Sequence, residues 1–226
     1  MQHSLSVIKG RGAQINPANR FHSEHSGNDP NAFCEEDFRV KTKFIKVYPK
    51  TIVTRVDSPD VAMNWSINPY QGCEHGCVYC YARNAHNYWG YSAGLDFESK
   101  ILVKHHAAKL LRKKLASKKW TASPIMVAGN TDCYQPAEQQ FKITRQLLEV
   151  FRDFSHPVGL ITKNDLILRD LDILKELQKH QLVKVAISMN TLNDDVRSFL
   201  EPRTSTIQKR LAAVKALSDA GIPVTV

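Results

Sequence analysis

From residue 64 onward, short apolar runs of strand type alternate with segments of helical periodicity. Strands are predicted at residues 64–68, 125–128, 158–161, 183–187 and 224–226. Between them, apolar side chains recur at helical spacing in three sets: Ala137, Phe141, Leu148 and Phe151; Leu168, Leu171, Leu174 and Leu177; and Ile207, Leu211, Val214 and Leu217. A further helix is expected at 105–119, and Gly221, followed by Pro223, is expected to end the last one. This alternation predicts an α/β fold with a parallel sheet and right-handed crossovers.

Two architectures fit the alternation: an open doubly wound sheet and a (β/α) barrel. Residues 64–226 are too few for a complete eight-unit barrel, which needs about 250 residues. A barrel would therefore be a partial (β/α) barrel. The last apolar run reaches Val226, where a final strand would lack a neighbour. We therefore expect the sequence to be a piece of a longer protein, incomplete at its C-terminus.

Residues 1–60 are polar and irregular, with loop signals at 10–12 and 16–20 and a polar, mobile stretch at 22–31. Residues 38–56 could supply short extended pieces. We expect an irregular N-terminal arm over 1–60 and a partial barrel over 61–226.

The chain carries 31 Lys and Arg against 22 Asp and Glu, a formal charge of +9 that permits an anionic partner such as nucleic acid. No apolar run approaches the roughly 20 residues of a membrane span, and residues 1–5 do not resemble a secretory signal. Cysteines number five, an odd count, and three of them fall within eight residues. A disulfide framework is therefore disfavoured, and a metal or redox site in a reducing cytoplasm is expected.

The three clustered cysteines are Cys73, Cys77 and Cys80, spaced C-x3-C-x2-C in a loop after the strand predicted at 64–68. Gly72 and Gly76 would let the backbone wrap closely around a bound object. Three thiolates converging from one tight loop suit an iron–sulfur cluster or zinc. Zinc would want a fourth ligand, for which His75 or His86 is near in sequence. The remaining alternative is three inert, half-buried thiols.

With Tyr79 directly before the last cysteine, this motif resembles that of the radical S-adenosylmethionine (SAM) superfamily. The resemblance implies a 4Fe–4S cluster held by Cys73, Cys77 and Cys80, with the fourth iron left open for SAM. It also implies a barrel of about six strands and an external one-electron donor. The electron splits SAM into methionine and a 5′-deoxyadenosyl radical that attacks a substrate. Tyr79 would present its backbone to the adenine.

Further segments are similar to a bacterial subgroup grouped with spore photoproduct lyase and labelled "DNA repair photolyase". These segments are 9–13, 16–21, 67–72, 94–98 and 201–204. Members of the subgroup continue past the end of this sequence. The resemblance implies lyase-like radical chemistry on a substrate such as a DNA lesion. Radical SAM modification of RNA or of a peptide is one alternative, and a non-catalytic, zinc-stabilised nucleic-acid-binding module is another.

Polar residues after the predicted strands are the candidate SAM ligands, because barrel sites lie at the carboxyl ends of strands. Asn130, Thr131 and Asp132 follow the strand at 125–128, where the family has a glycine-rich stretch that meets the SAM amino group. Lys163 could pair with the SAM carboxylate, and Ser188 could bond the ribose. The alternative is ordinary: a turn before the helix at Pro136, a surface lysine and a loop serine.

Cys133 lies on the candidate SAM loop and is either a hydrogen donor to a substrate radical or an inert buried thiol. Spore photoproduct lyase has its donor cysteine nearer the position of Gly129, so this chain departs from that pattern. Glu201 and Arg203 are expected to form an ion pair, either shaping the site or on the surface.

Two further groups are open to more than one interpretation. A basic run could contact phosphates or be a solvated helix face; it comprises Lys109, Arg112, Lys113, Lys114, Lys118 and Lys119. Aromatic residues after the cysteines could pack over the cluster loop or stack on bases; they are Tyr81, His86, Tyr88, Trp89 and Tyr91.

Overall fold

The main sheet in the computed structural model has six strands in the order β2-β3-β6-β7-β8-β9. The structure describes residues 8–21, 40–57 and 63–226. The strands are β2 (Val53–Arg55), β3 (Trp65–Ile67), β6 (Ile125–Val127), β7 (Val158–Thr162), β8 (Val183–Ile187) and β9 (Val224–Thr225). All neighbours from β3 to β9 are parallel, and β2 pairs with β3 in antiparallel orientation. The predicted α/β fold with a parallel sheet is confirmed.

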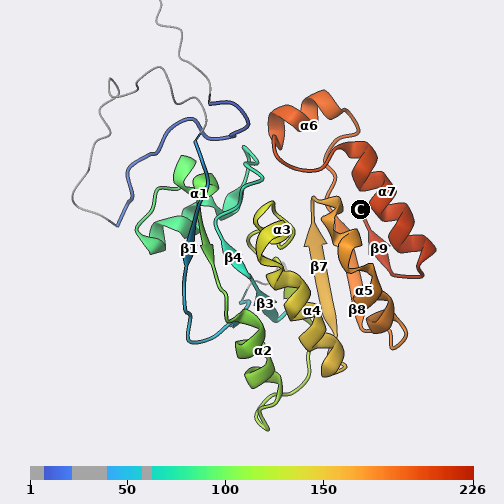
Figure 1. Ribbon diagram of the computed structural model, residues 1–226. Coiled ribbons are helices and arrows are strands. Elements are labelled where there is room, and N and C mark those ends of the chain that lie inside the picture. The colour runs from blue at the N-terminus through green and yellow to red at the C-terminus, as the bar shows by residue number, and fades with distance from the viewer. Residues whose placement is uncertain (1–7, 22–39, 58–62) are drawn as a thin grey trace, which may run out of the picture.

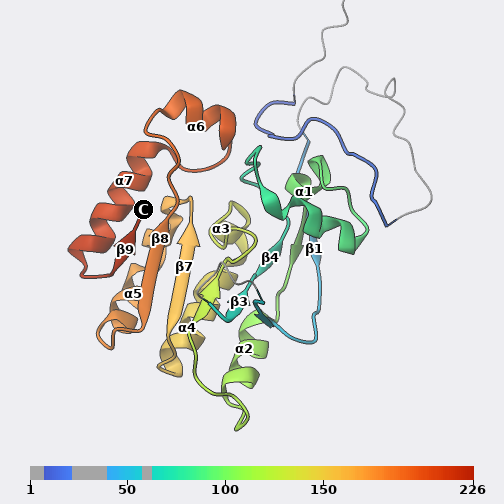
Figure 2. The same cartoon turned by 180° about the vertical axis from the view of Figure 1, so that it is seen from behind.

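Helices cover one face of this sheet (Figure 1). They are α2 (Ala107–Leu115), α4 (Ile143–Asp153), α5 (Leu171–Gln178) and α7 (Ile207–Asp219). Seen from behind, β7 and β8 have no helix in front of them (Figure 2). The sheet does not close on itself in the described residues, and this one-sided layering is that of a partial barrel. No helix in the described ranges is long and apolar enough to cross a membrane.

Two of the predicted helical segments are interrupted. The first divides at Lys142, whose φ of 50° ends α3 (Ala137–Phe141) and precedes α4. The carboxylate of Glu138 accepts the backbone N–H of Thr144 at 3.0 Å, so a buried acid caps the start of α4. The second begins as a 3-10 segment, η2 (Asp165–Asp170), and continues as α5. Spacing of apolar residues could not show either interruption.

The buried face of α7 consists of Ile207, Arg210, Ala213 and Leu217. Leu211 was expected on that face and is 48% exposed, so this part of the prediction is wrong. The reason is that Arg210, the residue before Leu211, lies on the buried face of α7. Gly221, with a φ of 72°, follows the end of α7 as predicted, and its N–H bonds the carbonyl of Ser218 at 2.8 Å.

A second, smaller sheet adjoins the first and has the order β1-β5-β4. Its strands are β1 (Lys43–Lys46), β5 (Lys100–Val103) and β4 (Tyr70–Gln71). Strands β1 and β2 confirm the extended pieces expected within 38–56, and each pairs with an element beyond residue 60. The polar stretch expected at 22–31 lies outside the described residues. The segment 40–57 is thus built into both sheets.

The two leucines of α7 provide a test of this packing. We expect Leu217→Ala to lower the free energy of unfolding by about 2–5 kcal/mol, because it leaves a cavity in the core. Leu211→Ala on the same helix should change it by less than about 0.5 kcal/mol. Urea denaturation of both variants measures the difference. Equal losses would contradict the observed helix face.

Candidate functional site

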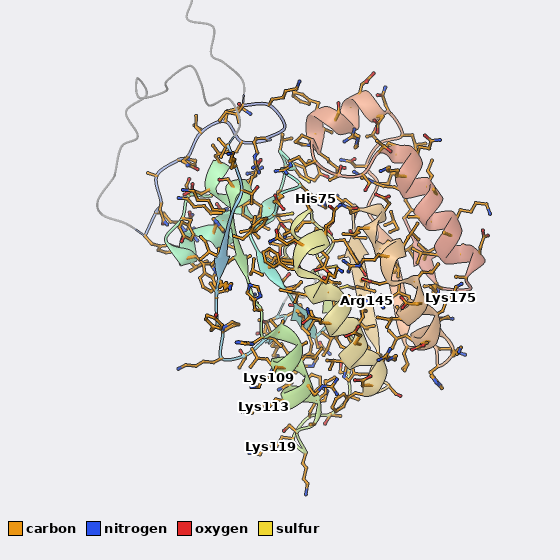
Figure 3. The ribbon with its side chains drawn as sticks, in the orientation of Figure 1. His75, Lys109, Lys113, Lys119, Arg145 and Lys175 are labelled. Carbon is orange, nitrogen blue, oxygen red and sulfur yellow. The ribbon has the colours of Figure 1, made fainter. Side chains whose placement is uncertain are left out.

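The cysteine loop follows β4 and lies across the carboxyl ends of the parallel strands. Val78 donates its N–H to the carbonyl of Leu200, at the end of α6 (Asp194–Leu200), at 3.0 Å. The hydroxyl of Tyr81 donates to the carbonyl of Gly129, just after β6, at 2.7 Å. His75 of this loop lies toward the opposite end of the molecule from Lys109, Lys113 and Lys119 of the α2 region (Figure 3). The loop therefore lies where parallel α/β folds hold their ligands.

The loop wraps tightly because two of its glycines adopt left-handed backbone conformations. Gly72 has a φ of 81° and Gly76 a φ of 67°. A side chain at Gly76 would come within 2.8 Å of a carboxylate oxygen of Glu98. The tight turns bring Cys73 and Cys77 inside the protein, while Cys80 is half-buried.

Burial shapes the chemistry of the three thiols. It raises the pKa of Cys73 well above its ordinary value, and it raises the pKa of Cys77 to about 12, with Glu201 adding to the effect. Burial also raises the pKa of Cys80. Thiols with raised pKa values stay protonated at neutral pH, so these three are poor free nucleophiles, and binding a metal would release their protons.

Three cysteine thiols on one loop are a donor set that an iron–sulfur cluster can use. Within residues 8–21, 40–57 and 63–226, no three His, Cys, Asp or Glu side chains are grouped to hold a single metal ion. In a zinc site all ligand atoms lie about 2.0–2.3 Å from one ion, which forces them together. A cluster spreads its thiolates over several irons and needs only cysteine sulfur. Three cysteines on one glycine-flexed loop meet that need.

Neither histidine near the loop completes a cysteine–zinc set. The Nδ1 of His75 lies 3.3 Å from an oxygen of Asp132, and its Nε2 lies 3.3 Å from the side-chain amide of Asn164. His86 is fully buried against Tyr91 and Phe97 with neither ring nitrogen hydrogen-bonded. Burial lowers the pKa of His86 to about 4, so its ring is neutral.

Asp132 is held inside the loop after β6. Its carboxylate accepts the hydroxyl of Thr162 at 2.7 Å and the backbone N–H of Lys163 at 2.8 Å. Burial raises the pKa of Asp132, but His75 and these two donors outweigh it and leave the pKa below its usual value. Asp132 therefore joins the cysteine loop, β6 and β7 as a fixed anion, with its oxygens already engaged.

The predicted neighbours of Asp132 are also fixed by internal hydrogen bonds. The side chain of Asn68 accepts the backbone N–H groups of Asn130 at 2.8 Å and Thr131 at 3.2 Å, and the Thr131 hydroxyl bonds the carbonyl of Tyr70 at 2.7 Å. Ala128 precedes them with a φ of 74°, an uncommon conformation for a residue with a side chain. Strained backbone of this kind is concentrated at functional sites.

Lys163 and Tyr79 meet at the buried carboxylate of Glu201. The Lys163 amine lies 3.1 Å from a Glu201 oxygen and 5.5 Å from the centre of the Tyr79 ring. The Tyr79 hydroxyl donates to the same carboxylate. Burial lowers the pKa of Lys163, but Glu201 and Tyr79 together outweigh burial and leave the pKa above its usual value, so the amine is charged. The sequence-predicted Lys163 and Tyr79 are thus brought together.

Glu201 also forms a fully buried pair with Arg210 of α7 at 2.5 Å. Burial raises the pKa of Glu201, but Tyr79, Arg210 and Lys163 together lower it below its usual value. The predicted pair of Glu201 with Arg203 is wrong, because Arg203 instead lies 3.5 Å from Glu74 in the cysteine loop. Sequence reasoning missed Arg210; its only signal was a cation on an apolar helix face.

Ser188 follows β8 at the same edge of the sheet. Its backbone N–H bonds the carbonyl of Thr162 at 2.8 Å, and its own carbonyl accepts from Arg210 at 2.9 Å. Arg210 therefore holds the end of β8 as well as Glu201. Ser188 and Lys163 lie at adjacent strand ends.

Cys133 lies in the main hydrophobic core. It is fully buried, and its sulfur lies 4.0 Å from the carbonyl of Ile161 on β7. Burial raises its pKa well above the ordinary value. This placement favours the inert thiol over the hydrogen donor.

Of the aromatic residues after the cysteines, some pack inside the protein and others are exposed, where they could stack on bases. His86 packs in the interior, whereas Tyr81 is 76% exposed beside the end of β6 and Tyr88 is also exposed.

In the basic run, Arg112 pairs with Asp153 at 2.5 Å and Lys114 lies over Trp120 at 4.7 Å. The other lysines of the run, Lys109, Lys113, Lys118 and Lys119, are exposed, so the run is a solvated surface around α2, remote from the cysteine loop.

Comparison with known proteins identifies the class of protein. Residues 67–226 match the radical SAM superfamily, and the chain belongs to that superfamily. An uncharacterized protein of Mycobacterium tuberculosis (strain H37Rv) is 31% identical over 180 residues, covering 79% of this chain and 53% of that protein. An uncharacterized protein of Methanocaldococcus jannaschii is 30% identical over 182 residues, covering 80% of this chain and 65% of the relative. The chain thus spans between 53% and 65% of the length of these two relatives.

Solved structures agree on the fold. Spore photoproduct lyase complexed with dinucleoside spore photoproduct matches with a TM-score of 0.59 and 18% identity, over 80% of this chain and 49% of that one. A variant of the lyase with bound AdoMet and the same dinucleoside matches equally well. At this identity the likeness establishes the shared fold, and it confirms the resemblance expected from the sequence.

The Arg210–Glu201 pair can be tested through stability. We expect Arg210→Met to lower the free energy of unfolding by about 3–5 kcal/mol, because it leaves a buried carboxylate without its main partner. Lys209→Met, at the exposed neighbouring position, is the control and should have little effect. Adding Glu201→Gln to Arg210→Met should recover part of the loss. Urea denaturation showing equal stability for the two single variants would contradict the buried pair.

Proposed function

We propose that this chain is the SAM-cleaving core of a radical SAM enzyme. Cys73, Cys77 and Cys80 would hold three irons of a 4Fe–4S cluster, and an external donor would supply one electron. When bound, the cluster provides the electron that cleaves SAM reductively to methionine and a 5′-deoxyadenosyl radical. The observation that carries the proposal is the glycine-flexed loop of three cysteines over the carboxyl ends of a parallel sheet.

The chain's own residues would bind and orient SAM at these strand ends. Lys163, a charged amine beside Glu201 at the end of β7, would attract the SAM carboxylate. Ser188 at the adjacent strand end would bond the ribose, and the loop at Asn130 and Thr131 would approach the amino group. Because the oxygens of Asp132 are engaged internally, we assign it the role of holding this loop rather than binding SAM directly.

For the substrate we propose a lesion in nucleic acid, with lyase-type chemistry. Three observations support this: the formal charge of +9, the exposed Tyr81 beside the candidate site, and the dinucleoside photoproduct bound by the lyase of like fold. Exposed aromatic rings stack on bases regardless of sequence. With Cys133 buried in the core, the hydrogen that quenches the product radical would come from another group.

Electron paramagnetic resonance of the anaerobically reconstituted, reduced protein tests the cofactor assignment. We expect a reduced 4Fe–4S signal that changes when SAM is added, together with release of 5′-deoxyadenosine. Cys73→Ala should abolish both, whereas the control Cys133→Ala should retain both because that thiol faces the core. A colourless protein with stoichiometric zinc would instead identify the zinc-stabilised binding module.

Binding to a labelled oligonucleotide tests the substrate class. We expect affinity to fall linearly on a log–log plot against salt concentration, because phosphate contacts release counterions. Tyr81→Ala should weaken binding by about 1–3 kcal/mol if its ring stacks on a base. Lys109→Ala, on the remote helix α2, is the control. Fluorescence anisotropy that shows no salt dependence, or equal losses in both variants, would contradict a nucleic-acid substrate at this site.

A further inference from the structure

Residues 8–19, which we call the strap, run along the outside of the segment that carries the cysteines. Asn16 and Asp96, on α1 (Leu95–Ser99), exchange two hydrogen bonds, at 3.0 and 2.8 Å. The carbonyl of Ile15 accepts the N–H of Leu95 at 3.1 Å. Asn19 donates to the carbonyls of Asn87 and Tyr91 at 3.0 and 3.1 Å. These hydrogen bonds attach the strap to residues 87–96, which follow the cysteine loop.

The strap approaches the cysteine loop so closely that only glycine fits at the contact. A side-chain carbon on Gly12 would lie 1.9 Å from the carbonyl oxygen of Gly76 and 3.2 Å from Val78. A side-chain carbon on Gly94 would lie 2.1 Å from the carbonyl oxygen of Ile15. The strap backbone thus packs directly on the backbone of the cysteine loop at Gly76 and on the segment after the loop at Gly94.

Glu98 is the centre of this arrangement. It is fully buried, and its carboxylate accepts the backbone N–H groups of Gly12 at 3.0 Å and Ala13 at 2.8 Å. The same carboxylate pairs with Arg83 at 2.6 Å. Arg83 in turn donates to the carbonyl of Cys77 at 2.9 Å. An unbroken series of charge-assisted hydrogen bonds therefore links the strap to the backbone of a cysteine.

Arg11 of the strap forms a second connection to the cysteine loop. Its guanidinium donates to the carbonyl of Glu98 at 2.6 Å and to the Thr42 hydroxyl at 3.0 Å. Thr42 then donates to the carboxylate of Glu74, within the cysteine loop, at 2.7 Å. Two positions of the cysteine loop, Glu74 and Cys77, are thus connected to residues 11–13.

We propose that the strap is a wall of the cluster site and that Glu98 is its positioning residue. By fixing Gly12, Ala13 and Arg83 together, Glu98 holds the cysteine loop in its closed shape and restricts the access of solvent, oxidants and chelators to the sulfur atoms. The identity of the group so protected rests on the proposed function. The closed loop itself is a property of this chain and is testable without any cofactor.

The test measures how fast each cysteine of the reduced, metal-free protein reacts with iodoacetamide under native conditions, with mass spectrometry resolving each site. Glu98→Gln preserves the side-chain shape, but it replaces one accepting oxygen by an NH2 group that cannot accept a backbone N–H, and it removes the charge that pairs with Arg83. Gly12→Ala forces the strap away from Gly76. We expect each variant to raise the alkylation rate of Cys77 about tenfold or more, since buried hydrogen bonds to a charged group are lost. The exposed strap residue supplies the control, Lys9→Ala, which should leave the rate unchanged.

Cys133 is the internal reference, because it lies in the main core away from the strap. Faster alkylation of Cys77 with an unchanged rate at Cys133 would support local opening of the strap. Wild-type rates at Cys77 in both variants, or a parallel rise at Cys133, would overturn the proposal. In protein reconstituted with iron and sulfide, the variants should also lose iron to a chelator faster than Lys9→Ala does. If wild-type protein takes up no cluster, the proposed function fails, while the alkylation result still decides the role of the strap.

Discussion

The carboxylate of Glu201 is the interaction on which the candidate site depends. It lies inside the protein and neutralises Arg210 from α7 while also binding Lys163 at the end of β7 and Tyr79 from the cysteine loop. A buried carboxylate costs several kcal/mol unless it is fully partnered, so its partners must all be in place together. This requirement ties the position of the cysteine loop to the ends of the parallel strands. The cysteine loop and the strand ends of the sheet are therefore coupled through the Glu201 side chain.

Much of the framework follows from the sequence. Runs such as 183–187 are short and rich in β-branched residues, which is the composition typical of buried parallel strands. The spacing of Cys73, Cys77 and Cys80 is a local property, so their shared loop was equally predictable. The paired segment 40–57 was less so, because short strands with exposed lysines, such as Lys43–Lys46, carry almost no periodic signal.

Side-chain direction explains what the sequence could not reveal. Cys133 and Asp132 are neighbours on one loop, yet the thiol enters the core while the carboxylate joins the polar layer with His75 and Thr162. The sequence identified Glu201 as a charged residue, but it predicted Arg203 as the partner because the two are close in sequence. Arg210 and Glu98 are buried charges, and a charged residue in sequence is normally read as solvent-exposed. Their roles arise only from tertiary contacts.

The cysteine loop is supported by residues that precede it and by residues that follow it in sequence, which bears on the order in which the protein assembles. Gly12 and Glu98 are separated by 86 positions, and Tyr79 and Glu201 by 122. Contacts between such distant positions form late in folding, because the intervening chain must first lose its freedom. During synthesis, the strap emerges before the cysteines and Glu201 emerges after them. The nascent loop therefore passes through an interval in which its thiols are already made but not yet enclosed, and the cluster proposed above would have access to them in that interval.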